Sequence, residues 1–232
     1  NTFIGHAVSD ATMTNAADYN TGVGAFSLSA LTSGAQNTAV GFDSLILNTS
    51  GNYNTAVGVD ALAYNLGSHN NTAVGRQAGY ATTGADNTYV GYFAGKGTTG
   101  AESFNVGLGS SALAVVVAGS SNSVVGESAG AAITSGSDNV IMGRHAGVTL
   151  STSGSNTLIG RSAGFTIAAG QVLTNGTVAV GASALYALTS GAGNVAVGYQ
   201  AGNILTSGSN NTVLGYDADT DDATAINQIV IG

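Results

Sequence analysis

The sequence predicts an all-β protein, a β-solenoid or β-roll of about fourteen stacked coils, and three observations support this prediction. A segment of the type Asn-Thr-Ala-Val-Gly recurs along the chain, most often every 17 residues. Its central residues are β-branched or small and alternate as in a strand. The composition, with 36 Gly, no Pro and only 7% charged residues, differs from that of an average globular domain. We therefore expect one repeat domain over residues 1–232, as a slice of a longer protein.

The final glycine of each segment serves as the anchor of one repeat. The anchors are Gly5, Gly24, Gly41, Gly58, Gly75, Gly91, Gly107, Gly126, Gly143, Gly160, Gly181, Gly198, Gly215 and Gly232. Eight of the thirteen spacings are 17 residues, and the others are expected to contain loop insertions. A unit with one short strand and one turn cannot bury its own apolar face, so successive units must stack.

Three residues before each anchor form the predicted strand. The first is mainly β-branched and the third is always large and apolar, as in Thr72 and Val74. Both lie on one face because side chains alternate, and we expect this pair to fill the coil. The middle residue is also apolar, so the opposite face needs a cover as well. We predict that it forms a self-association face, or packs on a second layer of the same chain; its large members are Tyr89, Val124, Ile141, Leu158 and Val213.

Asparagine stands four residues before the anchor in eleven of the fourteen repeats, with Ser103, Thr177 and Gln228 in the other three. Stacked asparagines can hydrogen-bond along one corner of a solenoid, so we predict a structural ladder. Its members are Asn37, Asn54, Asn71, Asn87, Asn122, Asn139, Asn156, Asn194 and Asn211. A small residue three after the anchor, such as Ala78, indicates a narrow part of the coil.

The two positions after the anchor vary most and are expected to lie on the surface. Arg and Tyr, which are common in binding hot spots, occur there repeatedly. A binding stripe is one interpretation, and a solvated variable face is the other. The candidate residues are Arg76, Tyr92, Arg144, His145, Arg161, Tyr199 and Tyr216.

The charge excludes several classes of function. A formal net charge of -8 with only four Lys and Arg argues against nucleic-acid binding, and no apolar run is long enough to span a membrane. No nucleophile–base set or histidine spacing indicates an enzyme, and we expect no cofactor. Asp43 and Asp60, at the same position of adjacent repeats, are the only carboxylate pair suited to glycan cleavage. A solvated acidic pair is the simpler interpretation.

The acidic segment near the end of the chain begins like a calcium loop. Asp217, Asp219 and Asp221 have the alternating pattern of calcium ligands. Asp222 stands where such loops need glycine, and Gln228 where they need glutamate. The three aspartates are therefore a weak calcium candidate, and an acidic turn of the last coil explains them better.

The strings NTAVGFDSL, NTAVGVDAL, NTAVGRQAG and NVAVGYQAG resemble the repeats of phage tail-fibre and related surface-fibre proteins. They are similar, more distantly, to the β-roll heads of trimeric autotransporter adhesins of the YadA type. Here, however, Asn stands one residue nearer the Gly, and the coil is about three residues longer than the adhesin's. The resemblance implies left-handed winding, a non-catalytic homotrimer, an extracellular location on a virion or bacterial surface, and attachment to a host cell, through a glycan or another receptor.

Two other functions remain open, an ice-binding and a glycan-binding β-solenoid. The threonine column suggests ice binding, which needs a flat and exposed threonine array. We expect this column to share its face with the coil interior, and Phe104, Val140, Val178, Val195 and Ile229 interrupt it. Both features favour a structural or adhesive fibre segment over an ice binder.

Overall fold

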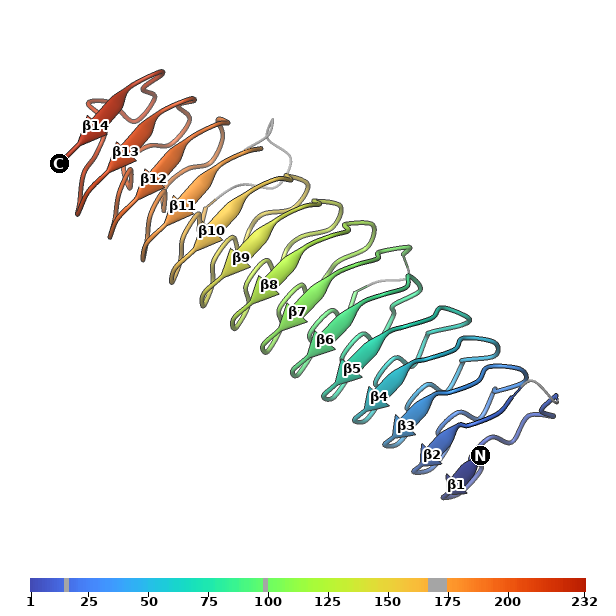
Figure 1. Ribbon diagram of the computed structural model, residues 1–232. Coiled ribbons are helices and arrows are strands. Elements are labelled where there is room, and N and C mark those ends of the chain that lie inside the picture. The colour runs from blue at the N-terminus through green and yellow to red at the C-terminus, as the bar shows by residue number, and fades with distance from the viewer. Residues whose placement is uncertain (15–16, 98–99, 167–174) are drawn as a thin grey trace. The chain divides into compact units, whose positions relative to one another are not determined.

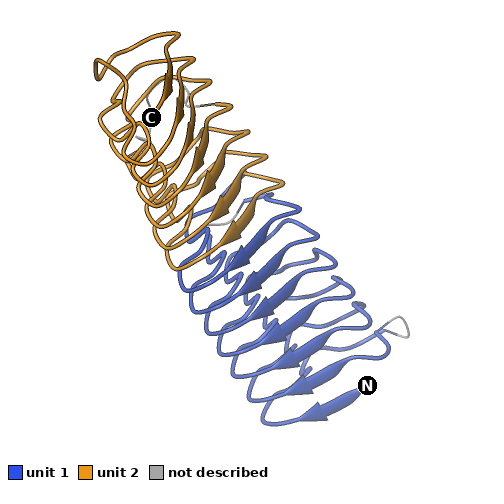
Figure 2. Cartoon of the chain, turned by 60° about the vertical axis from the view of Figure 1, so that its left-hand side comes forward, with its two compact units in different colours: residues 1–118 blue, residues 119–232 orange. Residues whose placement is uncertain are grey.

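A computed structural model describes residues 1–14, 17–97, 100–166 and 175–232. Across these residues the protein is all-β: one short strand per repeat, each parallel to its neighbours, with no helix (Figure 1). The predicted β-solenoid is confirmed. The chain divides into two compact units, residues 1–118 and 119–232, and both consist of stacked coils (Figure 2).

Every described strand has three residues. The first unit contains β1 (Thr2–Ile4), β2 (Thr21–Val23), β3 (Thr38–Val40), β4 (Thr55–Val57), β5 (Thr72–Val74), β6 (Thr88–Val90) and β7 (Val106–Leu108). The second contains β8 (Ser123–Val125), β9 (Val140–Met142), β10 (Thr157–Ile159), β11 (Val178–Val180), β12 (Val195–Val197), β13 (Thr212–Leu214) and β14 (Ile229–Ile231).

Neighbouring coils stack in register, so that equivalent residues lie side by side. Thr55 pairs with Thr72, and Val57 with Val74. Backbone hydrogen bonds run from coil to coil: the Thr55 N–H donates to the Asn71 carbonyl at 2.8 Å, and the Gly58 N–H donates to the Val40 carbonyl at 2.7 Å. Each coil thus satisfies the backbone polar groups of its neighbours, which a 17-residue unit cannot do alone.

The predicted orientation of the strand faces is wrong. The middle strand residues point into the coil, and Ala73 is fully buried, whereas Thr72 is half-buried and Val74 is 37% exposed. The residues assigned to a self-association face are therefore core residues, each at most 1% exposed: Tyr89, Val124, Ile141, Leu158 and Val213. Alternation shows which residues share a face, but it does not show which of two apolar faces is inside.

The anchor of the seventh repeat is Gly109, not Gly107. Gly107 is the middle residue of β7 and pairs with Tyr89, while Gly109 has the anchor conformation with φ of 130°. The ladder residue of this repeat is therefore Asn105 instead of Ser103, and Phe104 does not interrupt the threonine column. With this register the spacings on either side become 18 and 17, and nine of the thirteen are 17.

The anchor glycines are required by a close approach between coils. Gly58 has φ of +135°, and a Cβ there would lie 2.5 Å from the carbonyl oxygen of Gly75 in the next coil. Residues with side chains adopt positive φ at other positions: Asp60 and Gln77, two after their anchors, have φ of 56° and 54°. The coil thus turns through left-handed conformations that are uncommon for such residues.

Candidate functional site

The first and third residues of each strand point outward and form what we call the strand face. In-register pairing places them in two rows along each unit, about 4.8 Å from coil to coil. In the first unit the first-residue row has six successive threonines followed by Val106: Thr2, Thr21, Thr38, Thr55, Thr72 and Thr88. The third-residue row is apolar, and Val74 and Val90 are 37% and 38% exposed.

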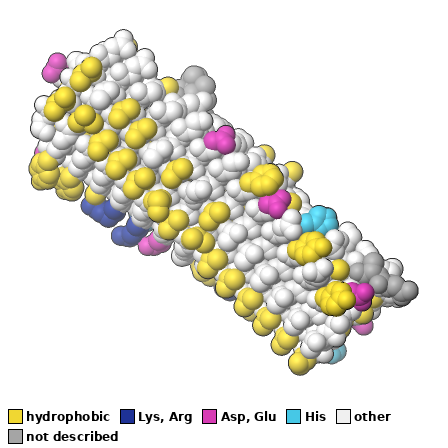
Figure 3. Space-filling model, in the orientation of Figure 1, with side chains coloured by type: hydrophobic (Ala, Val, Ile, Leu, Met, Phe, Trp, Pro, Cys, Tyr) yellow, Lys and Arg dark blue, Asp and Glu magenta, His cyan; other side chains and the backbone are white. Residues whose placement is uncertain are grey.

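The strand face of the second unit is more apolar. Its first-residue row contains Val140, which is 38% exposed, as well as Val178, Val195 and Ile229. Met142 in the other row is 44% exposed. Figure 3, in the orientation of Figure 1, shows rows of hydrophobic side chains on the side of the molecule that carries the strands. None of the described strands of either unit has a charged residue at these positions.

An uncharged, regular and partly apolar surface of this kind is typical of an interaction site. The strand face is therefore the candidate functional site. The sequence indicated the two rows but placed them inside the coil.

The asparagine ladder expected from the sequence is present, and each of its members directly precedes a strand. The Asn54 Oδ1 accepts a hydrogen bond from the Asn71 N–H at 3.0 Å, and the Asn54 Nδ2 donates to the Asn37 Oδ1 at 3.1 Å and to the Ser68 carbonyl at 2.8 Å. The ladder asparagines are at most 1% exposed. They are structural, because their amides are saturated by neighbouring coils instead of being turned toward solvent.

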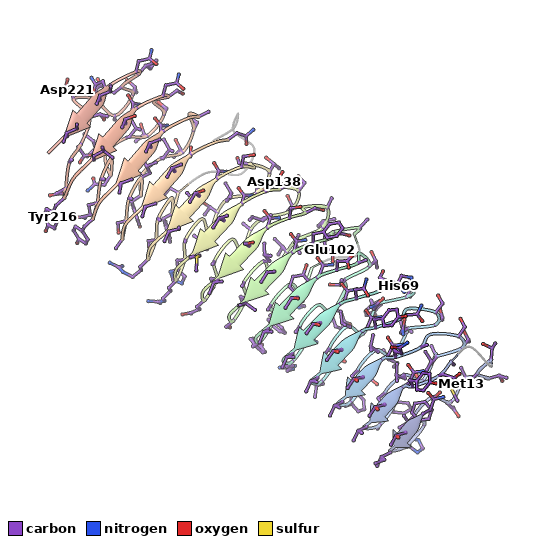
Figure 4. All side chains as sticks on the ribbon, in the orientation of Figure 1. Met13, His69, Glu102, Asp138, Tyr216 and Asp221 are labelled. Carbon is purple, nitrogen blue, oxygen red and sulfur yellow. The ribbon has the colours of Figure 1, made fainter. Side chains whose placement is uncertain are left out.

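The selected residues at the variable positions after the anchors lie on the surface, as predicted, whereas Ser162 at an equivalent position is buried. Tyr199 and Tyr216 stack with ring centroids 5.2 Å apart, and Tyr216 is labelled in Figure 4 at the corner where β13 ends. In the first unit the Arg76 guanidinium lies 5.9 Å from the centre of the Tyr92 ring. Arg144 pairs with Glu127 at 3.1 Å. The exposed Arg161 and the half-buried His145 continue the stripe, whose binding role stays a prediction.

A lateral pocket of about 180 Å³ lies on the first unit, on the chain segment that follows the anchors, and Asp43 and Asp60 are both in its wall with Tyr64 and Tyr80. The Gln77 Nε2 donates to the Asp60 Oδ2 at 3.1 Å. Burial, with a smaller contribution from the charge of Asp60, raises the pKa of Asp43. Its Oδ1 is buried and has no hydrogen-bond partner among the described residues.

The tyrosines form the apolar wall of this pocket together with Ile46, Leu47 and Ala63. The two rings meet edge to face, with centroids 4.9 Å apart and an interplanar angle of 60°. Hydrogen bonding with the Tyr64 hydroxyl, followed by burial, raises the pKa of Tyr80 to about 12. The Tyr80 phenol is therefore neutral at physiological pH.

A second lateral pocket, of about 300 Å³, lies on the second unit, lined by Ser183, Tyr186, Gln200 and Asn203. The Tyr186 ring stacks on Phe165 with centroids 5.0 Å apart and an interplanar angle of 6°. No charged side chain lines this pocket within the part of the chain that the structure describes.

The aspartates of the calcium candidate do not form a metal site. The Asp219 Oδ1 accepts a hydrogen bond from the Ile204 N–H at 3.1 Å, and the Asp221 Oδ2 accepts one from the Gln228 Nε2 at 3.3 Å. Asp217 is exposed. In the described ranges no group of three His, Cys, Asp or Glu side chains could hold a metal ion. The calcium hypothesis for Asp217, Asp219 and Asp221 is therefore not supported, because Asp219 and Asp221 accept hydrogen bonds from different donors and the three aspartates do not gather into one group.

Comparisons with known proteins found no matching family model, no matching curated protein and no matching solved structure. A search of the described residues for helices long and apolar enough to cross a membrane also found none.

Proposed function

We propose that this chain is a non-enzymatic structural and adhesive segment of an extracellular fibre, on a virion or a bacterial surface, that self-associates through the strand face. The observation that carries the proposal is the pair of uncharged rows on that face, with valines 37–39% exposed in the isolated chain. Contiguous exposed surface of this type is unusual in a soluble monomer.

Self-association fits the strand face better than a different partner does. In the first unit one row is threonine in six successive strands, and the other row is always a large apolar residue, so a second copy presents a surface with the same period. Three copies around one axis would each turn the face toward the centre and close the assembly without leaving it open to further copies. Burial contributes about 0.8 kcal/mol per methylene, and each added coil extends the interface.

Light scattering after gel filtration tests the proposal. The wild-type chain is expected to have about three times the mass of one chain. Val74→Lys with Val90→Lys should give a monomer with an unchanged circular dichroism spectrum, because two charges would be buried in the interface. Val59→Lys, at a residue that is 42% exposed but lies off the strand face, is the matched control and should remain a trimer. A wild-type monomer at tens of micromolar would overturn the proposal.

One observation favours ice binding as a second candidate. The threonine row of the first unit is outward and regular, so the expectation that it shares its face with the coil interior no longer counts against this function. The valines at the same positions of the second unit still count against ice binding. Thermal hysteresis, the gap between the melting and freezing temperatures of an ice crystal, tests this candidate. If the wild-type chain shows thermal hysteresis and Thr55→Lys abolishes it, ice binding replaces the fibre proposal. If the wild-type chain does not shape ice crystals, ice binding is excluded.

A further inference from the structure

We infer that the first unit's lateral pocket, formed by Asp43, Asp60, Tyr64 and Tyr80, binds one ring of a neutral, hydroxyl-rich glycan. The pocket is built from residues after the anchors, whereas the strand face is built from residues before them. The inference therefore goes beyond self-association and does not depend on it.

The polar wall of the pocket offers hydrogen-bond acceptors that lack donors. An ionised carboxylate can only accept hydrogen bonds. Asp43 lines the pocket, and because its Oδ1 is buried out of contact, its Oδ2 is the oxygen that can accept from a ligand. Asp60 is oriented by Gln77 through the 3.1 Å hydrogen bond, which leaves its other oxygen for a ligand. A sugar hydroxyl is a donor of the right kind, and hydrogen bonds to an ionised acceptor are stronger than those between neutral groups.

The aromatic wall offers the second element of sugar recognition. Tyr64 is 40% exposed, and its ring meets Tyr80 edge to face. A tyrosine combines an apolar face with a hydroxyl, and a pyranose likewise combines a C–H face with hydroxyls around its edge. The volume of about 180 Å³ is below the ~300–1,000 Å³ of most small-molecule sites, which suits one ring of a longer chain.

Other ligand classes fit the lining less well. An anionic ligand would meet two carboxylates, and the pocket contains no Lys, Arg or His. A metal ion would find only two acidic side chains, and no group of three exists in the described part of the chain. A purely apolar ligand would displace water from the Asp60 oxygen that Gln77 does not engage and leave it without a donor.

The second unit supports the same interpretation at an equivalent place in its repeats. Tyr186 stands five residues after Gly181, as Tyr80 stands five after Gly75. Ser183 and Gln200 each stand two after an anchor, as do Asp43 and Asp60. This pocket combines an aromatic ring with hydroxyl and amide groups and has no charge. The feature common to both pockets is thus hydrogen-bonding capacity beside an aromatic ring, which favours a neutral ligand over a cationic one.

Isothermal titration calorimetry with cellohexaose, laminarihexaose and xylohexaose, in parallel with oligogalacturonate and chitosan oligomers, tests the inference. We expect at least one neutral oligosaccharide to bind. Tyr64→Ala should weaken its affinity about tenfold or more, and Asp43→Asn, which retains the left-handed backbone preference, about fivefold. Tyr53→Ala, at a tyrosine of the same unit that is 56% exposed and outside the pocket, is the matched control and should have no effect.

The same titrations in the Val74→Lys, Val90→Lys background separate glycan binding from self-association, because the pocket is expected to bind in a monomer as well. Circular dichroism of each variant shows that it is folded. Binding of none of the neutral oligosaccharides at 10 mM, binding only of the acidic or amino oligomers, or neutral binding that Tyr64→Ala leaves unchanged would each overturn the inference.

Discussion

The coils around β3 and β4, in the first unit, and those around β9 and β10, in the second, fill their interiors in opposite ways. Around β3 and β4 the middle strand residue is small, and a leucine four after the anchor supplies the volume; the pairs are Ala39 with Leu45 and Ala56 with Leu62. Around β9 and β10 the middle residue is large and the leucine is replaced by glycine; the pairs are Ile141 with Gly147 and Leu158 with Gly164. Both arrangements are fully buried in these four coils, so the large side chain can come from either wall of the coil. The choice does not follow the division into units, because Ala179 with Leu185 in the second unit repeats the pattern of β3 and β4.

Tyr89 is the extreme case of this exchange. It is the largest fully buried side chain of the described residues, and its strand neighbours are Ala73 and Gly107. A Cβ on Gly95 would lie 2.3 Å from the ring. The aromatic side chain therefore occupies space that leucine takes in other coils.

The largest expected effect concerns the part of the coil that both units share. Gly58→Ala in the first unit and Gly143→Ala in the second should each reduce the free energy of unfolding by at least about 3 kcal/mol, because φ above +130° excludes a side chain and the Cβ would lie 2.5 Å from a carbonyl oxygen. Urea denaturation measures both. Gly176→Ala is the control, with φ of +68° and no atom within 4 Å of the new Cβ, and should cost about 1 kcal/mol. A much smaller cost in one unit would show that the anchors are not equivalent.

Placing a large side chain on both walls of one coil tests whether the two walls compete for the same space in the core. Gly147→Leu introduces the first unit's leucine into a coil of the second, where its Cβ would lie 2.8 Å from the Leu158 Cδ1. We expect a loss of about 2–3 kcal/mol from overpacking. Adding Leu158→Ala should restore at least half of this loss. If the two losses simply add in the double-mutant cycle, the two side chains do not compete for one volume.

Glu102 makes the coil beside Tyr89 sensitive to pH. Burial raises the pKa of Glu102 to about 8, and neither its carboxylate oxygens nor the Tyr89 hydroxyl has a hydrogen-bond partner among the described residues; Figure 4 labels Glu102. The folded state holds this proton at pH values where the unfolded chain has lost it. Stability is therefore expected to fall as the pH rises from about 4.5 to 8, by up to about 1.4 kcal/mol per pH unit. Glu102→Gln should remove the slope, and the exposed Glu127→Gln should retain it, as thermal unfolding across this range would show. A wild-type curve without the slope would contradict the burial of an ionisable carboxyl.

The smallest effect concerns a gap in the asparagine ladder. Thr177 stands at a ladder position, and its N–H donates to the Asn156 Oδ1 at 3.0 Å, but its hydroxyl is buried with no described partner. Thr177→Asn should raise the free energy of unfolding by about 1 kcal/mol, because the amide can donate and accept along the ladder. Thr177→Ser, which keeps the unpaired hydroxyl, should not. Equal urea midpoints for all three chains would show that the ladder is complete without this residue.

The repeat, its strand and the asparagine ladder could be predicted from the sequence because each rests on a column of one residue type. The orientation of the strand could not, because a face with Thr72 and Val74 and a face with Ala73 are both free of charge. A partial signal was nevertheless present: in four repeats glycine four after the anchor accompanies a large middle residue, as in Ile141 with Gly147, although Ala73 with Gly79 does not follow this pattern. That pairing identifies the middle residue as part of the core.

The lateral pockets were only partly predictable. Asp43 and Asp60 were selected as a pair, but Tyr64 and Tyr80 stand six and five residues after their anchors, and no column contains both. The left-handed conformations of residues such as Gln77 also had no signal, since glutamine has no preference for positive φ. Contacts with neighbouring coils stabilise them.

In-register stacking has a consequence for how such a chain reaches its native state. Most partners of a residue lie one repeat away, so the loop that must close before a contact forms stays near 17 residues however many coils are added. The mean separation of contacting residues, divided by chain length, therefore decreases as repeats accumulate. Each newly synthesised repeat can add to the coil before it, so that lengthening the protein within a unit adds steps to its folding without making any step slower.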